Sequence, residues 1–313
     1  MNTKTILSQF PRFMENWKSY TKQFPNIKEW YIASDYCFDK YSDKSNQVMT
    51  FTICPATDLK WLQAQINNLL KSDSKQRRNF SDEEIKFIRD NKYFFSISVI
   101  IEEQGTILVD KLKEDLGPWI QKIKEDKSNK NNIQKLQKFN KLKSYLSQKS
   151  FSKDLITKIG VVAIILGIII EFLIIKHNAS KVLWISDRGK IIDFNEGIVI
   201  DLANMCYHNL VKQRRTSYFL FGSAIENLST KQFDFDPMIR YPDIVSGVIS
   251  SINFEKGTVD AKKHFDMLVN GMASNKRIHI FRLINGSLKD GYVIEKVGQK
   301  DMLVRASSVF KNN

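Results

Sequence analysis

Three aspartates occupy positions where a strand or a helix would ordinarily carry an apolar side chain. Asp35 ends the run WYIASD, Asp187 ends KVLWISD, and Asp243 lies in IRYPDIVSG. Mg²⁺ prefers carboxylate oxygens as protein ligands. A divalent ion held by carboxylates can assist the hydrolysis of a phosphodiester. If the three elements converge, these acids predict a site for Mg²⁺ or Mn²⁺.

Each acid also fits a simpler interpretation. Asp35 fits a turn residue that opens the polar loop DKYSDK. Asp187, which precedes Arg188, fits an Asx turn. Asp243 follows Pro242 and fits the first turn of a helix, where a carboxylate favours the positive end of the helix dipole. The order of all three acids along the chain favours the metal interpretation.

The charge of the chain indicates a polyanionic partner. Lys and Arg number 48 against 34 Asp and Glu, which gives a net charge of +14 and a pI near 9.5. Such an excess favours nucleic acid or anionic lipid, although a composition rich in Lys, Asn and Ile would also produce it. Arg188 fits a phosphate contact or an ion pair with Asp193. Two basic clusters are predicted to hold a phosphate backbone: Lys75, Arg77 and Arg78, and Lys212, Arg214 and Arg215.

Several other classes of chemistry lack their sequence signatures. The three cysteines and four histidines have no zinc-ligand spacing, and no disulfide framework is indicated. Neither a GxSxG motif nor a phosphate-binding GxxxxGK[ST] loop is present. The first residues, MNTKTILSQF, are too short in apolar length for a signal peptide, so we expect a cytoplasmic protein.

The acids must be positioned by an α/β fold with a mixed sheet. Hydrophobic periodicity predicts strands, helices and a C-terminal hairpin made by IHIFRL and GYVIEKV. Ser81 and Glu84 predict a capping box at the start of one helix. The predicted strands are 29–36, 48–54, 93–102, 181–187 and 214–224, and the predicted helices are 1–28, 58–70, 81–91, 106–150 with a break, 194–213, 239–254 and 258–270.

One apolar stretch, 159–175, allows two interpretations. It reads IGVVAIILGIIIEFLII and is close to the lower length limit for a membrane span. Glu171 interrupts it, and an acid inside a bilayer is unfavourable. A helix buried in a protein core is apolar all round in the same way. We favour the buried helix and keep the span as the alternative.

The order of the acids resembles the ribonuclease-H-like superfamily. Within it, the chain is similar to a bacterial branch of uncharacterised proteins whose first strand reads roughly YIDESG and whose last helix reads roughly QxADxxAG. The corresponding stretches here are YIASDYC and RYPDIVSG, and WISDRGK is similar to the central Asp-Arg motif of that branch. The resemblance implies a ribonuclease-H-like domain over 1–255, with a lysine-rich helical insertion at about 106–150. Residues 256–313 would form a small α+β extension.

The resemblance implies a metal-dependent nuclease. Asp35, Asp187 and Asp243 would be its catalytic residues and metal ligands, with Mg²⁺ or Mn²⁺ as cofactor and nucleic acid as substrate. Asp35 is followed by Tyr36, where the family motif has Glu. This difference keeps open a non-catalytic module that binds nucleic acid or protein. A membrane-associated protein that uses 159–175 is the third alternative.

Overall fold

The computed structural model of the chain forms two compact units. It describes residues 6–38, 46–57, 59–70, 79–102, 106–126, 132–186, 189–210, 218–223, 236–259, 262–284, 287–297 and 301–306. The helical unit comprises Met1–Leu7, Glu103–Asn178 and Arg188–Thr216. The sheet unit comprises Ser8–Glu102, Ala179–Asp187 and Ser217–Asn313. The predicted α/β class with a mixed sheet is confirmed.

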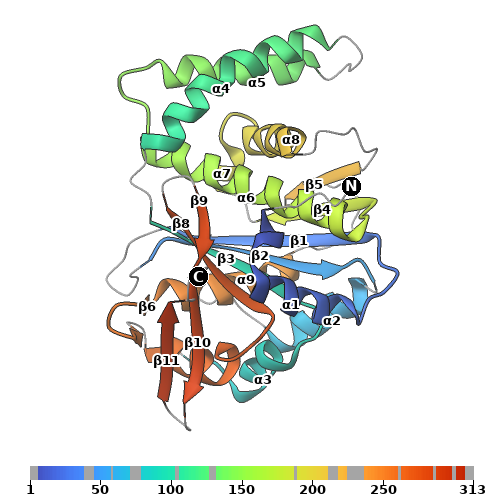
Figure 1. Ribbon diagram of the computed structural model, residues 1–313, viewed down its shortest axis with the longest axis vertical. Coiled ribbons are helices and arrows are strands. Elements are labelled where there is room, and N and C mark those ends of the chain that lie inside the picture. The colour runs from blue at the N-terminus through green and yellow to red at the C-terminus, as the bar shows by residue number, and fades with distance from the viewer. Residues whose placement is uncertain are drawn as a thin grey trace, which may run out of the picture. The chain divides into compact units, whose positions relative to one another are not determined.

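Within the described residues, seven strands form one mixed sheet (Figure 1). Their order across the sheet is β5-β4-β1-β2-β3-β8-β9. The strands β1, β2 and β3 are antiparallel neighbours, whereas β4 is parallel to β1 and β5 is parallel to β4. The bounds are β1 Glu29–Cys37, β2 Val48–Pro55, β3 Phe95–Ile101, β4 Lys181–Ser186, β5 Tyr218–Ser223, β8 Ile278–Ile284 and β9 Ser287–Asp290.

The centre of the sheet is buried on both faces. Every residue of β2 is buried, including Thr50 and Thr52. The Thr50 hydroxyl bonds that of Ser98 at 2.9 Å, and the Thr52 hydroxyl bonds that of Ser96 at 2.8 Å. Because buried polar groups need hydrogen-bond partners, these cross-strand pairs allow hydroxyl side chains in the core.

Helices cover opposite faces of the sheet. On α1 (Pro11–Thr21), Trp17 contacts the rings of Phe95 and Trp30 at 4.8 and 5.8 Å. On α9 (Asp236–Ser250), Ser246 bonds Asp35 of β1. Side chains alternate between faces along a strand, so Trp30 and Asp35 point to opposite sides. The helices α2 (Leu59–Leu69) and α3 (Asp82–Asp90) share a hydrophobic core with α9.

The helical unit is built around one long apolar helix. Its elements are α4 Thr106–Glu125, α5 Asn132–Leu146, α6 Lys153–His177, α7 Lys190–Asp193 and α8 Ile198–Leu210. Gly167 of α6 lies so close to α8 that an added Cβ would be 3.0 Å from the Cβ of Cys206. The helix α6 is long and apolar enough to cross a membrane, and 78% of its most apolar window is buried in the structure. That degree of burial is typical of a core helix.

The C-terminal part differs from the sequence prediction. The predicted hairpin between IHIFRL and GYVIEKV is wrong: β8 pairs with β3 and β9, whereas β10 (Tyr292–Val297) pairs with β11 (Asp301–Ala306). The sequence Asn285-Gly286, typical of a two-residue hairpin turn, stands between β8 and β9. Residues 256–313 therefore add β8 and β9 to the main sheet.

Short elements complete the C-terminal part. The two-stranded pair β6 (Ile252–Asn253) and β7 (Thr258–Val259) follows α9. The helix predicted at 258–270 is divided into α10 (Lys262–Asp266) and the π-helical segment η3 (Met267–Met272). Met267, Leu268 and Met272 of η3 are buried in the same hydrophobic core as α3 and α9.

Candidate functional site

Asp35 lies inside strand β1, under helix α9. It pairs with Thr50 of β2, and β1 continues for two more residues to Cys37, so Asp35 does not open the turn. Ser246 Oγ donates a hydrogen bond to Asp35 Oδ2 at 2.9 Å. One helical turn later, Ser250 Oγ lies 3.2 Å from Cys37 Sγ. These two contacts align α9 with the carboxyl-terminal end of β1.

Asp243 is the second acid that the structure describes, and it lies in the middle of α9. The helix begins at Asp236, so the interpretation of Asp243 as a first-turn acid is wrong. Ser246 Oγ also lies 3.1 Å from the Asp243 carbonyl oxygen. Asp35 and Asp243 are both partly buried. Ser246 therefore connects the strand acid to the helical turn that carries the second acid.

Asp187 and Arg188 lie outside the described residues, but the strand that precedes them is described. In the parallel pairing of β1 with β4, Ser34 is opposite Ser186. Ser34 immediately precedes Asp35, and Ser186 immediately precedes Asp187. The predicted phosphate-binding cations also lie outside the described residues: Lys75, Arg77, Arg78, Lys212, Arg214 and Arg215.

A buried polar network links the ends of β1 and β4. Trp184 Nε1 donates to Ser34 Oγ at 2.8 Å, and Ser34 Oγ is 2.8 Å from the Tyr36 hydroxyl. Ser186 Oγ donates to the same Tyr36 hydroxyl at 3.2 Å. These residues fix the register of the two strands at the edge where Asp35 lies. Sequence reasoning missed them, although hydroxyl side chains in two apolar strands were a visible signal.

The donor chemistry of this site suits a hard divalent cation. Asp35 and Asp243 supply carboxylate oxygens from neighbouring elements, and Ser246 orients the first of them. In the part of the chain that the structure describes, no group of three or more His, Cys, Asp or Glu side chains could hold a metal ion. The structure thus describes two of the three acids that the sequence predicts as metal ligands, and the metal site stays a prediction.

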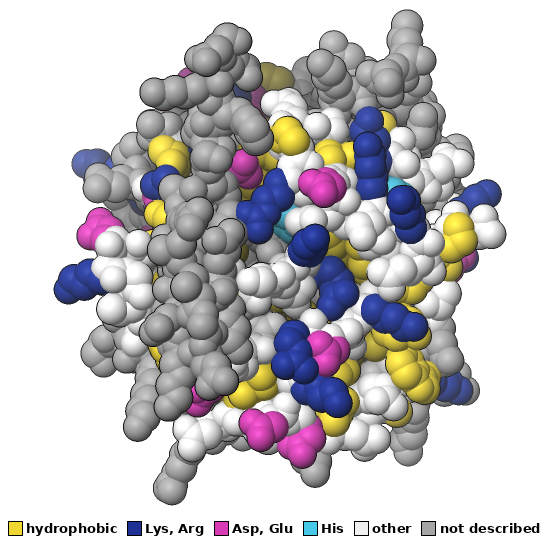
Figure 2. Space-filling view, turned by 60° about the horizontal axis from the view of Figure 1, so that its bottom comes forward, with side chains coloured by type: hydrophobic (Ala, Val, Ile, Leu, Met, Phe, Trp, Pro, Cys, Tyr) yellow, Lys and Arg dark blue, Asp and Glu magenta, His cyan; other side chains and the backbone are white. Residues whose placement is uncertain are grey.

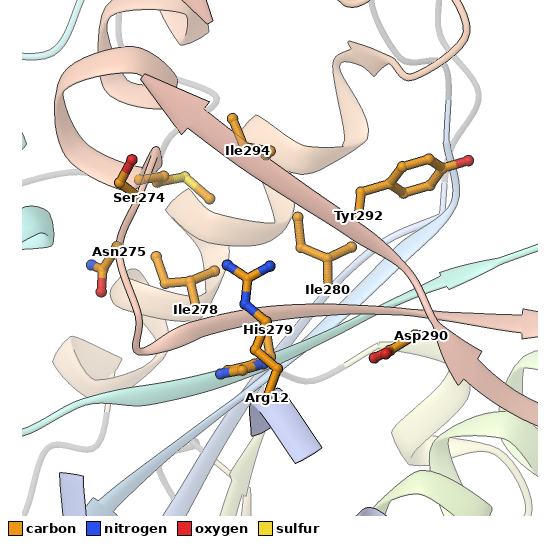
Figure 3. Close-up of a pocket in the computed structure, with 10 residues that line it drawn as sticks. Arg12, Ser274, Asn275, Ile278, His279, Ile280, Asp290, Tyr292 and Ile294 are labelled. Carbon is orange, nitrogen blue, oxygen red and sulfur yellow. The ribbon is translucent and has the colours of Figure 1, made fainter. Parts of the chain in front are cut away.

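A separate small hollow lies between α1, β8 and β10 (Figure 3). Arg12 lies beside His279 there, and Asp290 lies at the β9 side. Burial lowers the pKa of His279 to about 3 and raises the pKa of Asp290. Asn16 Nδ2 is 3.2 Å from His279 Nε2. None of the lining residues comes from β1 or α9, so this hollow is distinct from the acid site.

Comparison of the chain with protein-family profiles, with curated proteins and with solved structures gives no significant match in any of the three.

Proposed function

We propose that the protein is a metal-dependent nuclease of the ribonuclease-H-like type, in which Asp35, Asp187 and Asp243 hold Mg²⁺ or Mn²⁺. One observation carries the proposal: the parallel pairing of Ser34 with Ser186 ends one residue before each of two aspartates. Carboxyl ends of neighbouring parallel strands meet at the same edge of a sheet. This is the arrangement that the resemblance to the superfamily requires of its first and fourth strands.

The position of α9 supports the same proposal. The hydrogen bond from Ser246 to Asp35 brings the helix that carries Asp243 over this edge. A divalent metal bound there would supply a Lewis acid and a water of lowered pKa for attack on a phosphodiester. Ser246 restrains the Asp35 carboxylate, which reduces the reorganisation needed on binding. Arg188, which follows Asp187 directly, would donate to a phosphate oxygen of the substrate.

The proposal predicts metal-dependent cutting that needs the aspartates. The purified full chain would be incubated with labelled single- and double-stranded DNA and RNA in Mg²⁺, Mn²⁺ or EDTA. We expect cutting only with a metal, and a loss of at least about 100-fold in Asp35→Asn and Asp187→Asn, because each change removes a charged ligand. Mn²⁺ binding, measured by calorimetry, should weaken in the same variants.

Asp266→Asn is the matched control, since Asp266 is an exposed aspartate at the end of α10. It should cut as the wild type does. Thermal unfolding of every variant would show that the fold is intact. The proposal fails if Asp35→Asn and Asp187→Asn remain folded and both bind Mn²⁺ as tightly as the wild type does. Nucleic-acid binding that ignores EDTA, with no cutting on any substrate, would indicate the non-catalytic module instead.

A further inference from the structure

A groove lined by aromatic side chains lies between α2 and α3. Its volume is about 410 Å³, and Trp61, Phe87 and Tyr93 line it. The Trp61 side chain is 42% exposed, and its ring meets that of Tyr93 edge-on at 5.1 Å. The other four tryptophans of the chain are at most 9% exposed. An aromatic ring exposed in a groove can serve as a stacking surface for a ligand.

The groove also carries cations. Lys86 and Lys92 line it, and the Lys92 ammonium lies 5.7 Å from the centre of the Tyr93 ring. Of the two acids in the lining, Asp90 accepts two hydrogen bonds from Arg89, at 2.8 and 3.0 Å. The other acid is Glu83, so the lining holds two lysines and two acids. The pKa of Asp90 is lowered by its hydrogen bonds from Arg89 and also by the nearby Lys86. Figure 2, in which the bottom of Figure 1 is turned forward, shows Lys and Arg side chains on this face together with hydrophobic side chains and several Asp and Glu side chains.

Exposed aromatic rings among cations match the chemistry of single-stranded nucleic acid. Unpaired bases stack on aromatic side chains while lysines attract the phosphates. A duplex offers no free base face, because its bases are stacked on one another. A proline-rich peptide also docks on aromatic grooves, but it lacks the regularly spaced phosphates that Lys86 and Lys92 would bind.

We propose that the α2–α3 groove binds an unpaired base of single-stranded nucleic acid against Trp61, with Lys86 and Lys92 at the phosphates. The inference deepens the proposed function, on which it rests, by naming single strands as the substrate class. The sequence that follows α2, KSDSKQRR, contains four cations and one acid. That excess in the sequence, together with the net charge of +14 of the whole chain, favours a polyanion as the partner.

Tryptophan fluorescence tests the groove directly, because Trp61 is the most exposed of the five tryptophans. The wild-type chain would be titrated in EDTA with a short oligothymidylate, with a duplex of the same length, and with a proline-rich peptide. We expect strong quenching by the single strand and weak quenching by the duplex. Quenching by the peptide with none by the oligothymidylate would overturn the inference in favour of a protein partner.

Binding of the single strand by three variants completes the test. Trp61→Ala should weaken it about tenfold, which is within the range found when a stacking side chain is removed. Trp61→Phe should retain most of the affinity, because it keeps an aromatic face. Lys256→Ala, a change at an exposed lysine outside the groove, should leave the affinity unchanged. Wild-type affinity in Trp61→Ala would overturn the inference.

The two proposals fail separately. Binding of the single strand is measured in EDTA, where no divalent metal is available and no metal-dependent cutting takes place. Trp61-dependent binding without any metal-dependent cutting would refute the nuclease and retain the groove. Metal-dependent cutting together with unchanged single-strand binding in Trp61→Ala would refute the groove and retain the nuclease.

Discussion

Small hydroxyl side chains organise the strand ends near the candidate site. Ser246 bonds the Asp35 carboxylate, while Ser34 and Ser186 share the Tyr36 hydroxyl on the other face of the sheet. Buried hydroxyl groups stay in a protein core when each finds a partner. The result is a carboxylate held on one face and a strand register fixed on the other.

His279 makes the stability of the sheet unit depend on pH. Its ring stacks on Phe95 at 5.3 Å, and burial lowers its pKa from 6.5 to about 3. Below pH 6.5 the His279 ring is protonated in the unfolded chain but stays neutral in the folded chain. The free energy of unfolding therefore falls as the pH falls. The loss approaches about 1.4 kcal/mol per pH unit. His279→Gln should remove this slope in urea unfolding measured between pH 7 and pH 5.

Two other buried groups must be separated from this effect. His177, with a pKa lowered to about 4, contributes with the same sign. Glu171, with a pKa raised to about 7 by burial, has the opposite sign, because the folded chain keeps its proton up to a higher pH than the unfolded chain does. The comparison is therefore between the slopes of the wild type and the variant. Equal slopes would show that His279 titrates normally in the folded chain.

At the scale of elements, α6 and α8 pack closely because Gly167 has no side chain. A Cβ there would be 3.0 Å from Cys206 Cβ and 3.2 Å from the Ala203 carbonyl oxygen. We expect Gly167→Ala to destabilise the protein by about 1–3 kcal/mol through overpacking. Gly160→Ala is the control in the same helix, since nothing lies within 4 Å of a Cβ at that position.

Gly160→Ala should stabilise the protein by up to about 1 kcal/mol, because alanine favours the helix over glycine. Chemical denaturation of both variants measures the difference. If Gly167→Ala proved as stable as Gly160→Ala, α6 and α8 would not pack as closely at Gly167 as the structure describes.

Local signals in the sequence predicted most elements but not all of their partners. The capping box of Ser81 and Glu84 is present as expected. The pairing of β8 with β3 was missed, because it joins segments far apart in the chain and leaves no local pattern. The short polar strand β9, SLKD, has no strand-like alternation of hydrophobicity.

The candidate site was predictable only in part. The resemblance to the superfamily implied that Asp35 and the helix of Asp243 meet, and the Ser246 contact agrees with it. The predicted helix 239–254 begins three residues after the start of α9 at Asp236, so the sequence suggested a first-turn acid at Asp243, which instead lies inside the helix. The positions of Asp187 and the basic clusters stay predictions.

At the scale of the whole molecule, the positive charge should govern nucleic-acid affinity. The net charge is +14. If Lys75, Arg77 and Arg78 each contact a phosphate, replacing all three with alanine should reduce the slope of log affinity against log salt by about 2, since each contact on a single strand contributes about 0.7. Fluorescence anisotropy at several salt concentrations measures this slope.

A charge-matched control separates contact from net charge. Replacing Lys122, Lys124 and Lys149 of the helical unit with alanine changes the net charge equally. The slope should then stay near that of the wild type. Equal reductions in the two triple variants would contradict a specific role for the first cluster.

The pairing of β1 with β4 has a consequence for how the chain is made. β1 ends at Cys37, and β4 begins only at Lys181, after the segment Glu103–Asn178 of the helical unit. A chain leaving the ribosome therefore exposes one bare edge of β1 until more than a hundred further residues have been translated. Pairing between strands so far apart in the chain is slow, and the unpaired edge of β1 leaves nascent chains prone to associate. The three acids of the proposed site can meet only after β4 and then α9, which follows it in the chain, have been translated.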